Sequence, residues 1–291
     1  MKIPSRRPLL ALLASLLAAA AFAQEAPKKE SVAFEAATLI DGNTPVRGEL
    51  TLPPAAAGAR LPAVVVIHSA GGFEDQTRAP YVAALNRAGI ATLELNLFAR
   101  GGRPKTSQMN LPHTFGALLY LAQRPEIDPA RIGIAGFSHG GLLSMLAASR
   151  QLTRQYAGDT HRFAAHLPVY PVCWAHLSIA AGRNPVYPQS VYQALTGAPV
   201  RILAGDKDLY DEPDTCGKFI AALPEAERAS VALTVYAGAT HGWDTPEYRN
   251  YHDGAAYLGR GGFITQERNE AVAGQSLESA TGFFRGVLLK E

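Results

Sequence analysis

A serine between glycines at residues 136–141 offers a nucleophile for acyl transfer. The segment reads Gly-Phe-Ser-His-Gly-Gly, with an apolar run at residues 131–135 before it and a small-residue stretch after it. Between a strand and a helix, a Gly-x-Ser-x-Gly step makes a tight turn that exposes the serine hydroxyl over the sheet. We expect Ser138 to be a nucleophile and the amide of His139, at a helix N-terminus, to bind an oxyanion. The alternative is a glycine-rich turn without chemistry, and the strand and helix on either side disfavour it.

The serine needs a base, because a serine hydroxyl is a poor nucleophile at neutral pH. His241 lies just past the expected strand at residues 231–236, in a loop that opens on the same sheet edge as Ser138. We therefore predict His241 as the base. An acid between the two in the chain would complete the order Ser, Asp, His of the α/β-hydrolase triad.

The acid that orients this base should follow the strand at residues 200–204. The sequence there is Gly-Asp-Lys-Asp, so both Asp206 and Asp208 are candidates. Asp206 is close enough to the strand to be a local turn former, whereas Asp208 lies far enough along the loop to reach a histidine. We favour Asp208.

A second oxyanion donor is expected in the loop after residues 63–67, which reads His-Ser-Ala-Gly-Gly-Phe at residues 68–73. Glycines there permit close backbone approach to a substrate oxygen. We predict the amide of Ala70 as the donor and Gly71 as the next choice. A plain glycine-rich turn would show the same sequence.

The remaining histidines lie in no metal-ligand spacing, since the chain has no His-Glu-x-x-His and no paired cysteine motif. We therefore expect no metal and no cofactor. His68, at the end of the strand at residues 63–67, is interpreted as a buried hydrogen-bonding residue.

Apolar strands that alternate with helical stretches must position these residues. The run at residues 63–67 has no polar alternation, which is typical of a parallel strand buried on both faces. The alternation predicts a parallel sheet covered by helices. Further strands are expected at residues 90–95, 131–135, 163–169, 200–204 and 231–236, and helices at 81–88, 114–122, 140–149, 215–222 and 266–289.

One domain is expected from residue 32 to residue 291, without a linker or a repeat. It opens with a hairpin of residues 32–40 and 46–52, joined by the turn former Asp-Gly-Asn. Residues 24–31 are polar and are expected to be a flexible lead. Residues 245–262 lack a clear period and are expected to be a loop or lid.

The first 23 residues have the pattern of a signal peptide. Lys2, Arg6 and Arg7 precede an apolar run that ends in Ala-Phe-Ala at residues 21–23. A membrane anchor is the alternative, but the fifteen-residue run at 9–23, apolar except for Ser15, falls short of the roughly 20 residues that span a bilayer. We expect cleavage after Ala23 and a periplasmic or secreted protein without membrane association.

Cleavage would also change the charge of the chain, whose formal value is +2. It removes three of the 27 basic residues and none of the 25 acidic ones, which leaves about −1. No basic stripe remains to bind nucleic acid. The expected partner is a small-molecule ester or lactone substrate, and the oligomeric state is open.

These residues together resemble the dienelactone hydrolase family of α/β-hydrolases, over about residues 63–243. The resemblance lies in the run at 64–68 followed by Gly72, Leu-Phe-Ala-Arg at 97–100, the elbow at Ser138, Gly-x-x-Asp at 205–208 and Ala-Thr-His-Gly at 239–242. It implies an α/β-hydrolase fold, a mostly parallel sheet with helices on both faces. It also implies Asp208 as the acid and Ala70 as an oxyanion donor.

The chain departs from that family's pattern near the expected site. Ser138 stands where dienelactone hydrolases proper have a cysteine, and Ser69 stands where the family has a glutamate that interacts with the resting cysteine. Of the two arginines that hold a substrate carboxylate, Arg100 matches one and Thr245 replaces the other. The resemblance therefore implies a shared fold and reaction class.

Aromatic residues on loops at the carboxyl ends of the strands are candidates to bind the substrate. The aromatic candidates are Phe73, Trp174 and Trp243. Arg100 is a fourth candidate, expected to bind a substrate carboxylate, with pairing to a surface acid as its alternative. Each aromatic side chain has the alternative of packing in the core or within its loop.

The two cysteines, Cys173 and Cys216, follow different strands of the expected sheet. Loops at the carboxyl ends of neighbouring strands meet, and a cysteine pair in an exported protein favours a disulfide over two free thiols. Such a bond would hold the loop that carries Asp208.

A serine hydrolase is the function that these residues favour. A serine peptidase or amidase of the same fold is the alternative, although 268 residues after cleavage leave no room for the accessory domain that usually gives such peptidases their selectivity. A noncatalytic binding protein would more often have lost a triad member, and this chain keeps a candidate for every role.

Overall fold

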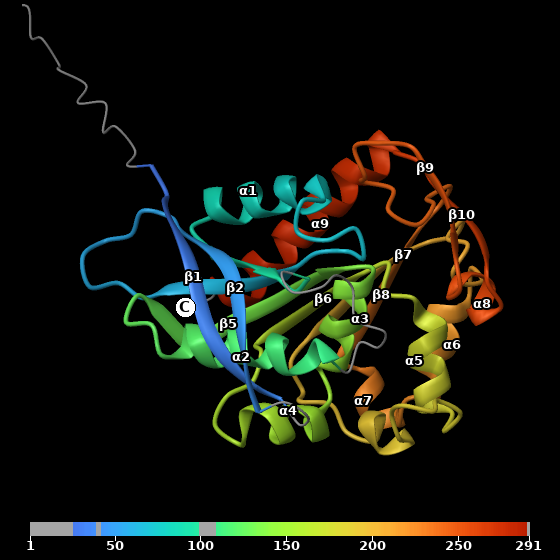
Figure 1. The fold of residues 1–291 in the computed structure, drawn as a ribbon, viewed down its shortest axis with the longest axis horizontal. Helices are drawn as coiled ribbons and strands as arrows, with labels where there is room; N and C mark the ends of the chain where they lie inside the picture. The colour runs from blue at the N-terminus through green and yellow to red at the C-terminus, as the bar shows by residue number, and fades with distance from the viewer. Residues whose placement is uncertain (1–25, 39–41, 99–108, 290–291) are drawn as a thin grey trace, which may run out of the picture.

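The computed structural model describes residues 26–38, 42–98 and 109–289. Within these ranges eight strands form one sheet in the order β1-β2-β4-β3-β5-β6-β7-β8 (Figure 1). Both β1 and β4 run antiparallel to β2, and every further pair is parallel. The strands are β1 (Lys28–Thr38), β2 (Gly42–Leu52), β3 (Leu61–Ile67), β4 (Ala91–Asn96), β5 (Ile127–Phe137), β6 (Ala165–Val169), β7 (Val200–Gly205) and β8 (Val231–Tyr236).

Helices cover both faces of this sheet. In Figure 1, α1 and α9 lie above the sheet and α4 lies below it. The helices are α1 (Ala79–Arg87), α2 (Leu111–Ala122), α3 (His139–Leu146), α4 (Arg150–Ala157), α5 (Cys173–Ala180), α6 (Thr215–Ala222), α7 (Glu225–Arg228), α8 (Ala256–Gly259) and α9 (Glu270–Leu288), with short 3₁₀ turns at η1 (Gln76–Arg78) and η3 (Gln189–Tyr192). Along the described ranges, no helix combines the length and the apolar character that crossing a membrane requires.

The central strand β3 shows how the two faces are filled. All of its residues are buried, as the unbroken apolar run predicts. Val65 and Ile67 belong to the core that contains α2 and α3, whereas Val64 and Val66 belong to the core that contains α1 and α9. Burying an aliphatic side chain of this size stabilises the fold by about 1.5–3 kcal/mol. The predicted parallel sheet with helices on both faces is therefore confirmed.

The expected flexible lead at residues 24–31 is wrong from Lys28 onward. Lys28–Thr38 is strand β1, and Lys28 pairs with Leu52 while Ser31 pairs with Glu49. The charged residues do not exclude a strand, because β1 is an edge strand, where exposed lysine and glutamate are common.

Four helices were not predicted: the eight-residue helices α4 and α5 and the four-residue helices α7 and α8. The helix expected at residues 140–149 ends at Leu146, and Ser149 then begins α4 by accepting a hydrogen bond from the backbone N–H of Leu152. The cap and the apolar face of α4 were signals that the sequence carried. The second helix, α5, begins at Cys173 in a segment that was predicted only as a loop.

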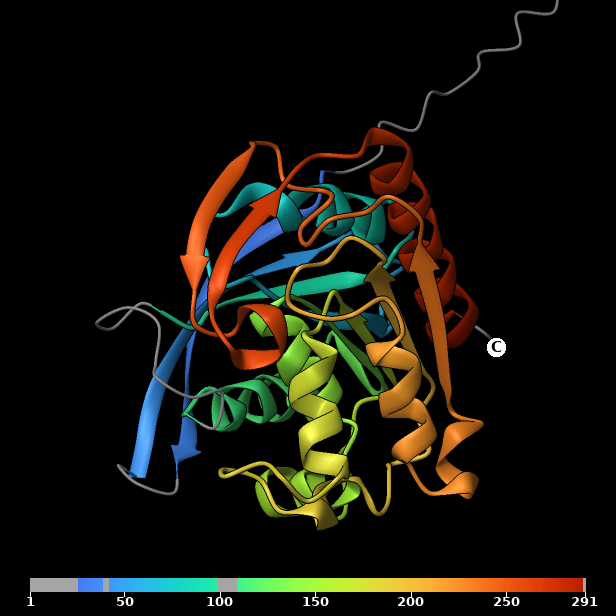
Figure 2. The ribbon, with the colours of Figure 1, turned by 90° about the vertical axis from the view of Figure 1, so that its right-hand side faces the viewer.

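The segment expected to be a loop or lid contains a second, two-stranded sheet. Strand β9 (Arg249–Asp253) pairs antiparallel with β10 (Gly262–Gln266), and α8 lies between them in the chain. Figure 2 shows the two strands side by side in orange, with α8 at their lower end. We call residues 249–266 the hairpin. Sequence periodicity missed it because its strands are short and only Ile264 and Gln266 among their residues are buried.

Candidate active site

Ser138 lies in a strained turn between β5 and α3. Its φ of 52° and ψ of −108° fall in a region that residues with a Cβ rarely adopt. The neighbouring glycines permit this turn, since a Cβ on Gly136 would lie 2.0 Å from the carbonyl oxygen of Gly140, and a Cβ on Gly140 2.3 Å from that of Ile67. The strand, the turn and the helix are those that the Gly-x-Ser-x-Gly motif predicts.

His241 lies in the loop after β8 and points at this serine. Its Nε2 is 2.8 Å from Ser138 Oγ, and its side chain is fully buried. The rings of Tyr170 and Tyr210 pack against the imidazole, with centroids 4.9 and 4.3 Å away. These two rings fix the plane of the imidazole.

Asp208 reaches the other nitrogen of the imidazole from the loop after β7. Its Oδ2 lies 2.7 Å from His241 Nδ1, and its Oδ1 accepts the backbone N–H of Tyr210 at 2.9 Å. A carboxylate only accepts hydrogen bonds, so Nδ1 is the protonated nitrogen and Nε2 is left to accept from Ser138. Asp206 instead accepts the backbone N–H of Gly238 at 2.6 Å, so the structure brings Asp208 and not Asp206 to the histidine.

The two expected oxyanion donors follow the neighbouring strands β5 and β3. His139 is the first residue of α3, where backbone N–H groups carry the positive end of the helix dipole. Ala70 follows β3, and β3 pairs with β5 so that Ile67 lies opposite Gly136. The turn at Ala70 is closed by a hydrogen bond from the backbone N–H of Gly72 to the carbonyl of Ser69, at 3.2 Å. That the two amides bind a substrate oxygen stays a prediction.

His68 is a buried hydrogen-bonding residue, as predicted. Its Nδ1 donates to the carbonyl of Ser69 at 2.6 Å, and its Nε2 accepts the backbone N–H of Leu97 at 3.2 Å. Burial lowers the pKa of His68 to about 4, so the ring is neutral and supports the loop after β3 without adding charge.

Comparison with known proteins identifies the family of this chain. A sequence model of the dienelactone hydrolase family matches residues 46–286, which is most of the chain. The chain belongs to the dienelactone hydrolase family. The match confirms the resemblance seen over about residues 63–243, and it supports an enzyme that hydrolyses esters. A search of curated proteins finds no match.

Solved structures share the fold of this dienelactone hydrolase family member at low sequence identity. Est1E from Butyrivibrio proteoclasticus is 17% identical with a TM-score of 0.57, and the match covers 89% of this chain and 99% of Est1E. Thermogutta terrifontis esterase 2, phosphorylated by paraoxon, is 17% identical with a TM-score of 0.60, over 90% and 96% of the two chains. The Pyrococcus horikoshii acylaminoacyl peptidase is 15% identical with a TM-score of 0.61, over 90% of this chain but 42% of the peptidase. The fold is the α/β-hydrolase fold.

One of the four expected substrate-binding residues, Trp243, lies in the core beside α9. The side chain of Trp243 is fully buried. Its Nε1 donates to Ser276 Oγ of α9 at 3.0 Å, and its ring packs edge-on against Tyr170 and Tyr236. Trp243 is a core residue, because the loop after His241 turns back toward α9 and not toward the site.

The other three have different outcomes. The centre of the Phe73 ring lies 4.4 Å from the Arg78 guanidinium. Phe73 lines a cavity of about 890 Å³ between α1 and the β2–β4 side of the sheet. None of Ser138, Asp208 and His241 lines this cavity. Trp174 is half-buried against α8, and its Nε1 donates to the carbonyl of Ala255 at 3.0 Å. Arg100 lies outside the described residues. Substrate binding by Trp174 and Arg100 stays a prediction, and Phe73 is placed against the cavity instead.

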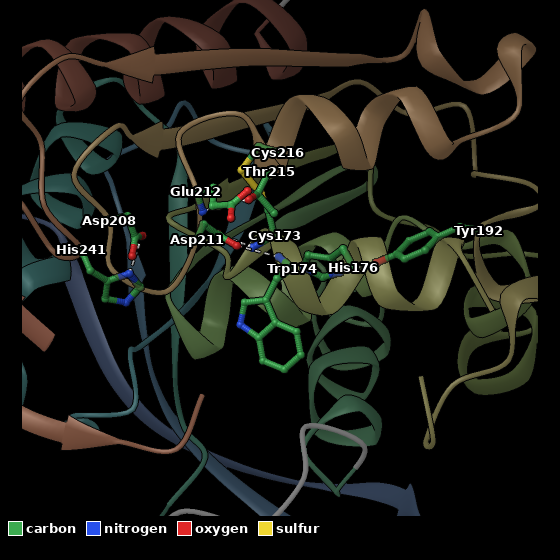
Figure 3. Close-up of a disulfide and its surroundings, with 10 residues drawn as sticks. All are labelled: Cys173, Trp174, His176, Tyr192, Asp208, Asp211, Glu212, Thr215, Cys216 and His241. Carbon is green, nitrogen blue, oxygen red and sulfur yellow. Dashed lines mark hydrogen bonds and ion pairs between the residues drawn. A yellow bond between two sulfur atoms is a disulfide. The ribbon is translucent and has the colours of Figure 1, made fainter. Parts of the chain in front are cut away.

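The disulfide between Cys173 and Cys216 is confirmed and joins the beginnings of α5 and α6, with Cα atoms 5.0 Å apart. Beside it, Asp211 accepts the backbone N–H groups of Cys173 and Trp174 at 2.6 and 2.7 Å. Figure 3 shows Asp211 between the disulfide and the Asp208–His241 pair. Burial and the nearby charge of Asp208 raise the pKa of Asp211. The disulfide thus lies next to the loop that carries Asp208.

A buried carboxylate that the sequence did not reveal is linked to the histidine through Tyr170. Asp244 accepts the hydroxyls of Tyr81 and Tyr170 at 2.7 and 2.8 Å, and burial raises its pKa to about 6. Tyr170 is the residue whose ring packs on His241. No local pattern marks such a group, because its partners come from α1 and from the loop after β6.

Proposed function

We propose that this protein is an exported serine hydrolase that cleaves a carboxylic ester or a lactone through an acyl-enzyme. The observation that carries the proposal is the buried chain of hydrogen bonds from Asp208 through His241 to Ser138, with the serine in a strained strand-to-helix turn. Membership of the dienelactone hydrolase family supports the same reaction class.

The first half of the proposed reaction forms the acyl-enzyme. Ser138 Oγ attacks the substrate carbonyl while His241 Nε2 takes the hydroxyl proton, and Asp208 stabilises the resulting imidazolium. The amides of His139 and Ala70 donate to the oxyanion of the tetrahedral intermediate. The intermediate collapses, His241 returns its proton to the leaving alkoxide, and an alcohol departs. With a lactone, the alcohol stays attached to the acyl group.

The second half hydrolyses the acyl-enzyme. His241 removes a proton from water, the resulting hydroxide attacks the acyl carbonyl, and the second tetrahedral intermediate expels Ser138 Oγ. The serine recovers its proton from His241, and the carboxylic acid leaves. The side chains present balance every proton, so the reaction requires no metal and no cofactor.

The substrate is proposed as a small ester or lactone and not as a dienelactone in particular. Only Arg100 matches the pair of arginines in the family's carboxylate pocket, and the other position is Thr245, whose side chain is buried. A hydroxyl holds a carboxylate more weakly than a guanidinium, which makes two charge-assisted hydrogen bonds.

A serine peptidase or amidase is the second candidate, since one structural neighbour is an acylaminoacyl peptidase. The match covers 42% of that peptidase, so more than half of its length has no counterpart in this alignment. Membership of the dienelactone hydrolase family favours an esterase. A noncatalytic binding protein is disfavoured by the hydrogen-bonded serine and histidine.

Export is proposed from the leader and the disulfide together. Residues 1–23 have the pattern of a signal peptide, and the Cys173–Cys216 bond is expected to persist in an oxidising compartment. We propose a periplasmic or secreted protein that begins at Gln24. Mass spectrometry of the protein secreted by a bacterial host tests this, and a chain that retains residues 1–23 would contradict it.

A substrate panel tests the proposed reaction. Wild type, Ser138→Ala and the control Ser190→Ala, an exposed serine of η3, are compared on activated esters, lactones and peptide anilides. We expect hydrolysis of esters or lactones by wild type and by Ser190→Ala, and none above background by Ser138→Ala. Cleavage of peptide anilides alone would favour the peptidase, and undiminished ester hydrolysis by Ser138→Ala would exclude the serine mechanism.

A further inference from the structure

The loop after β3 is organised by one carboxylate outside the proposed catalytic residues. We call residues 68–75 the oxyanion loop. Ser69 Oγ donates to Asp75 Oδ2 at 2.9 Å and accepts the backbone N–H of Gly71 at 3.0 Å. Ala70 lies between Ser69 and Gly71, which are joined by the second of these hydrogen bonds. The direction of the Ala70 amide is therefore set by its two neighbours, of which Ser69 bonds to Asp75 directly and Gly71 is linked to Asp75 through the Ser69 hydroxyl.

The same carboxylate packs directly against the backbone of the loop. A Cβ on Gly71 would lie 2.5 Å from Asp75 Oδ2 and 3.2 Å from Ser69 Oγ. Any side chain at this position would push the carboxylate away from the serine. Glycine at 71 is thus explained by the position of Asp75 and not only by approach of the substrate.

Both oxygens of Asp75 are fully engaged. Oδ1 accepts the backbone N–H and the hydroxyl of Thr77, and Oδ2 accepts Ser69 Oγ and Arg249 Nη1, the last at 3.1 Å. The Asp75 side chain is 4% exposed. Burial alone would raise the pKa of Asp75, but the hydrogen bonds of Thr77 and Ser69 and the charge of Arg249 hold it below its usual value. The group stays ionised and can hold its donors.

Arg249 connects this loop to the hairpin, because it is the first residue of β9. The hairpin also contacts the loop that carries Asp208, since Asp253 accepts the hydroxyl of Tyr210 at 2.9 Å. Just after the hairpin, the backbone N–H of Glu267 donates to Thr240 Oγ1 at 3.0 Å, beside His241. One continuous segment therefore touches the loops of the acid, the base and the proposed oxyanion donor.

We propose that Asp75 is a positioning residue that aims the Ala70 amide at the oxyanion, and that Arg249 fixes Asp75 to the hairpin. This proposal rests on the proposed function, because an aimed amide matters only if an oxyanion forms at Ser138. Within the described residues, the hydrogen bonds of the Asp75 carboxylate go to Ser69, Thr77 and Arg249 and not to Ser138. Its contribution appears in the transition state, where the amide has its charged partner.

The test compares Asp75→Asn and Ser69→Ala with the control Glu74→Gln, an exposed acid in the same loop. Active sites are counted with a fluorophosphonate, and kcat per counted site, KM and the inhibition constant of a trifluoromethyl ketone are measured. The ketone adds to Ser138 and places an oxyanion where the transition state has one. We expect kcat per site to fall about 10- to 100-fold in both variants, less than the 10²–10³ of losing a whole donor. The inhibition constant should rise by the same factor and KM should stay within about twofold.

The outcomes separate this proposal from the proposed function. If wild type neither hydrolyses esters nor labels at Ser138, the proposed function fails. If wild type is active but kcat per site and ketone binding are unchanged in Asp75→Asn and Ser69→Ala, only the role of Asp75 fails. A variant that loses countable sites while each remaining site keeps full kcat has lost folding alone, and this too would overturn the positioning role. Arg249→Ala should show the same effect as Asp75→Asn but smaller, because Thr77 and Ser69 still hold the carboxylate.

Discussion

The carboxyl edge of the sheet and the hairpin hold the candidate site by different means. At the sheet edge, backbone packs on backbone, as where the elbow glycines bring α3 against the ends of β3 and β5. The hairpin contacts the surrounding loops through hydrogen bonds. Some come from side chains on its strands, such as Arg249 on Asp75 and Asp253 on Tyr210. Others come from the backbone N–H groups of Tyr257 and Leu258, which donate to the carbonyls of Leu209 and Tyr210 at 2.8 and 3.0 Å. The sheet edge places the candidate catalytic groups, and the hairpin holds the loops around them. Changes at the edge should therefore abolish the reaction, and changes at the hairpin should weaken it.

His241→Ala is the change at the sheet edge with the largest expected effect. Within the described residues, His241 is the only side chain that forms hydrogen bonds with both Ser138 and Asp208, and this variant removes it. We expect kcat for an activated ester to fall about 10⁶-fold, because members of such a triad act as a unit. His161→Ala, at a partly exposed histidine before β6, is the control. A loss of less than tenfold in His241→Ala would contradict the role of the base.

Asp208→Asn tests the second group at the edge. An amide nitrogen facing Nδ1 favours the tautomer with its proton on Nε2, which cannot accept from Ser138. We expect kcat to fall about 10⁴-fold. Asp206→Asn is the matched control two residues away, where the carboxylate holds the backbone of Gly238 and should leave kcat within a few-fold. A larger loss in Asp206→Asn than in Asp208→Asn would reverse the assignment.

Removing the disulfide tests how much the bond between α5 and α6, beside the loop that carries Asp208, stabilises the fold. The double variant Cys173→Ala/Cys216→Ala opens a loop closed across 43 positions. We expect the free energy of unfolding to fall by about 4 kcal/mol in the chain-entropy account. Urea denaturation of the variant, of wild type and of reduced wild type measures this. Equal midpoints for all three would show that the bond constrains nothing.

Tyr210→Phe is the mildest change and addresses the hairpin alone. It keeps the ring against His241 but removes the hydroxyl that Asp253 accepts. We expect the free energy of unfolding to fall by about 1–3 kcal/mol and kcat to fall a few-fold. Tyr248→Phe, at a tyrosine that is 65% exposed, is the control and should change neither. A loss as large as that of Asp208→Asn would mean that the hairpin places the reacting groups directly.

The same contrast explains what the sequence could and could not predict. Ser138, Asp208 and His241 follow strands that the apolar runs reveal, so short stretches of sequence were enough to find them. The pairing of Arg249 with Asp75 spans 174 positions, and no local pattern marks it. Trp243 was misplaced for a related reason, since an aromatic residue after a strand can turn to the site or to the core. Contacts with α9 decided its direction, and those are invisible until the chain is folded.

The most direct test of the central claim is labelling with a fluorophosphonate followed by peptide mass spectrometry. The reagent forms a stable phosphonyl ester only with a serine that is activated as a nucleophile. We predict one adduct per chain, on the peptide that contains Ser138, and none in Ser138→Ala. No adduct on folded wild type, or an adduct that survives Ser138→Ala, would contradict the account.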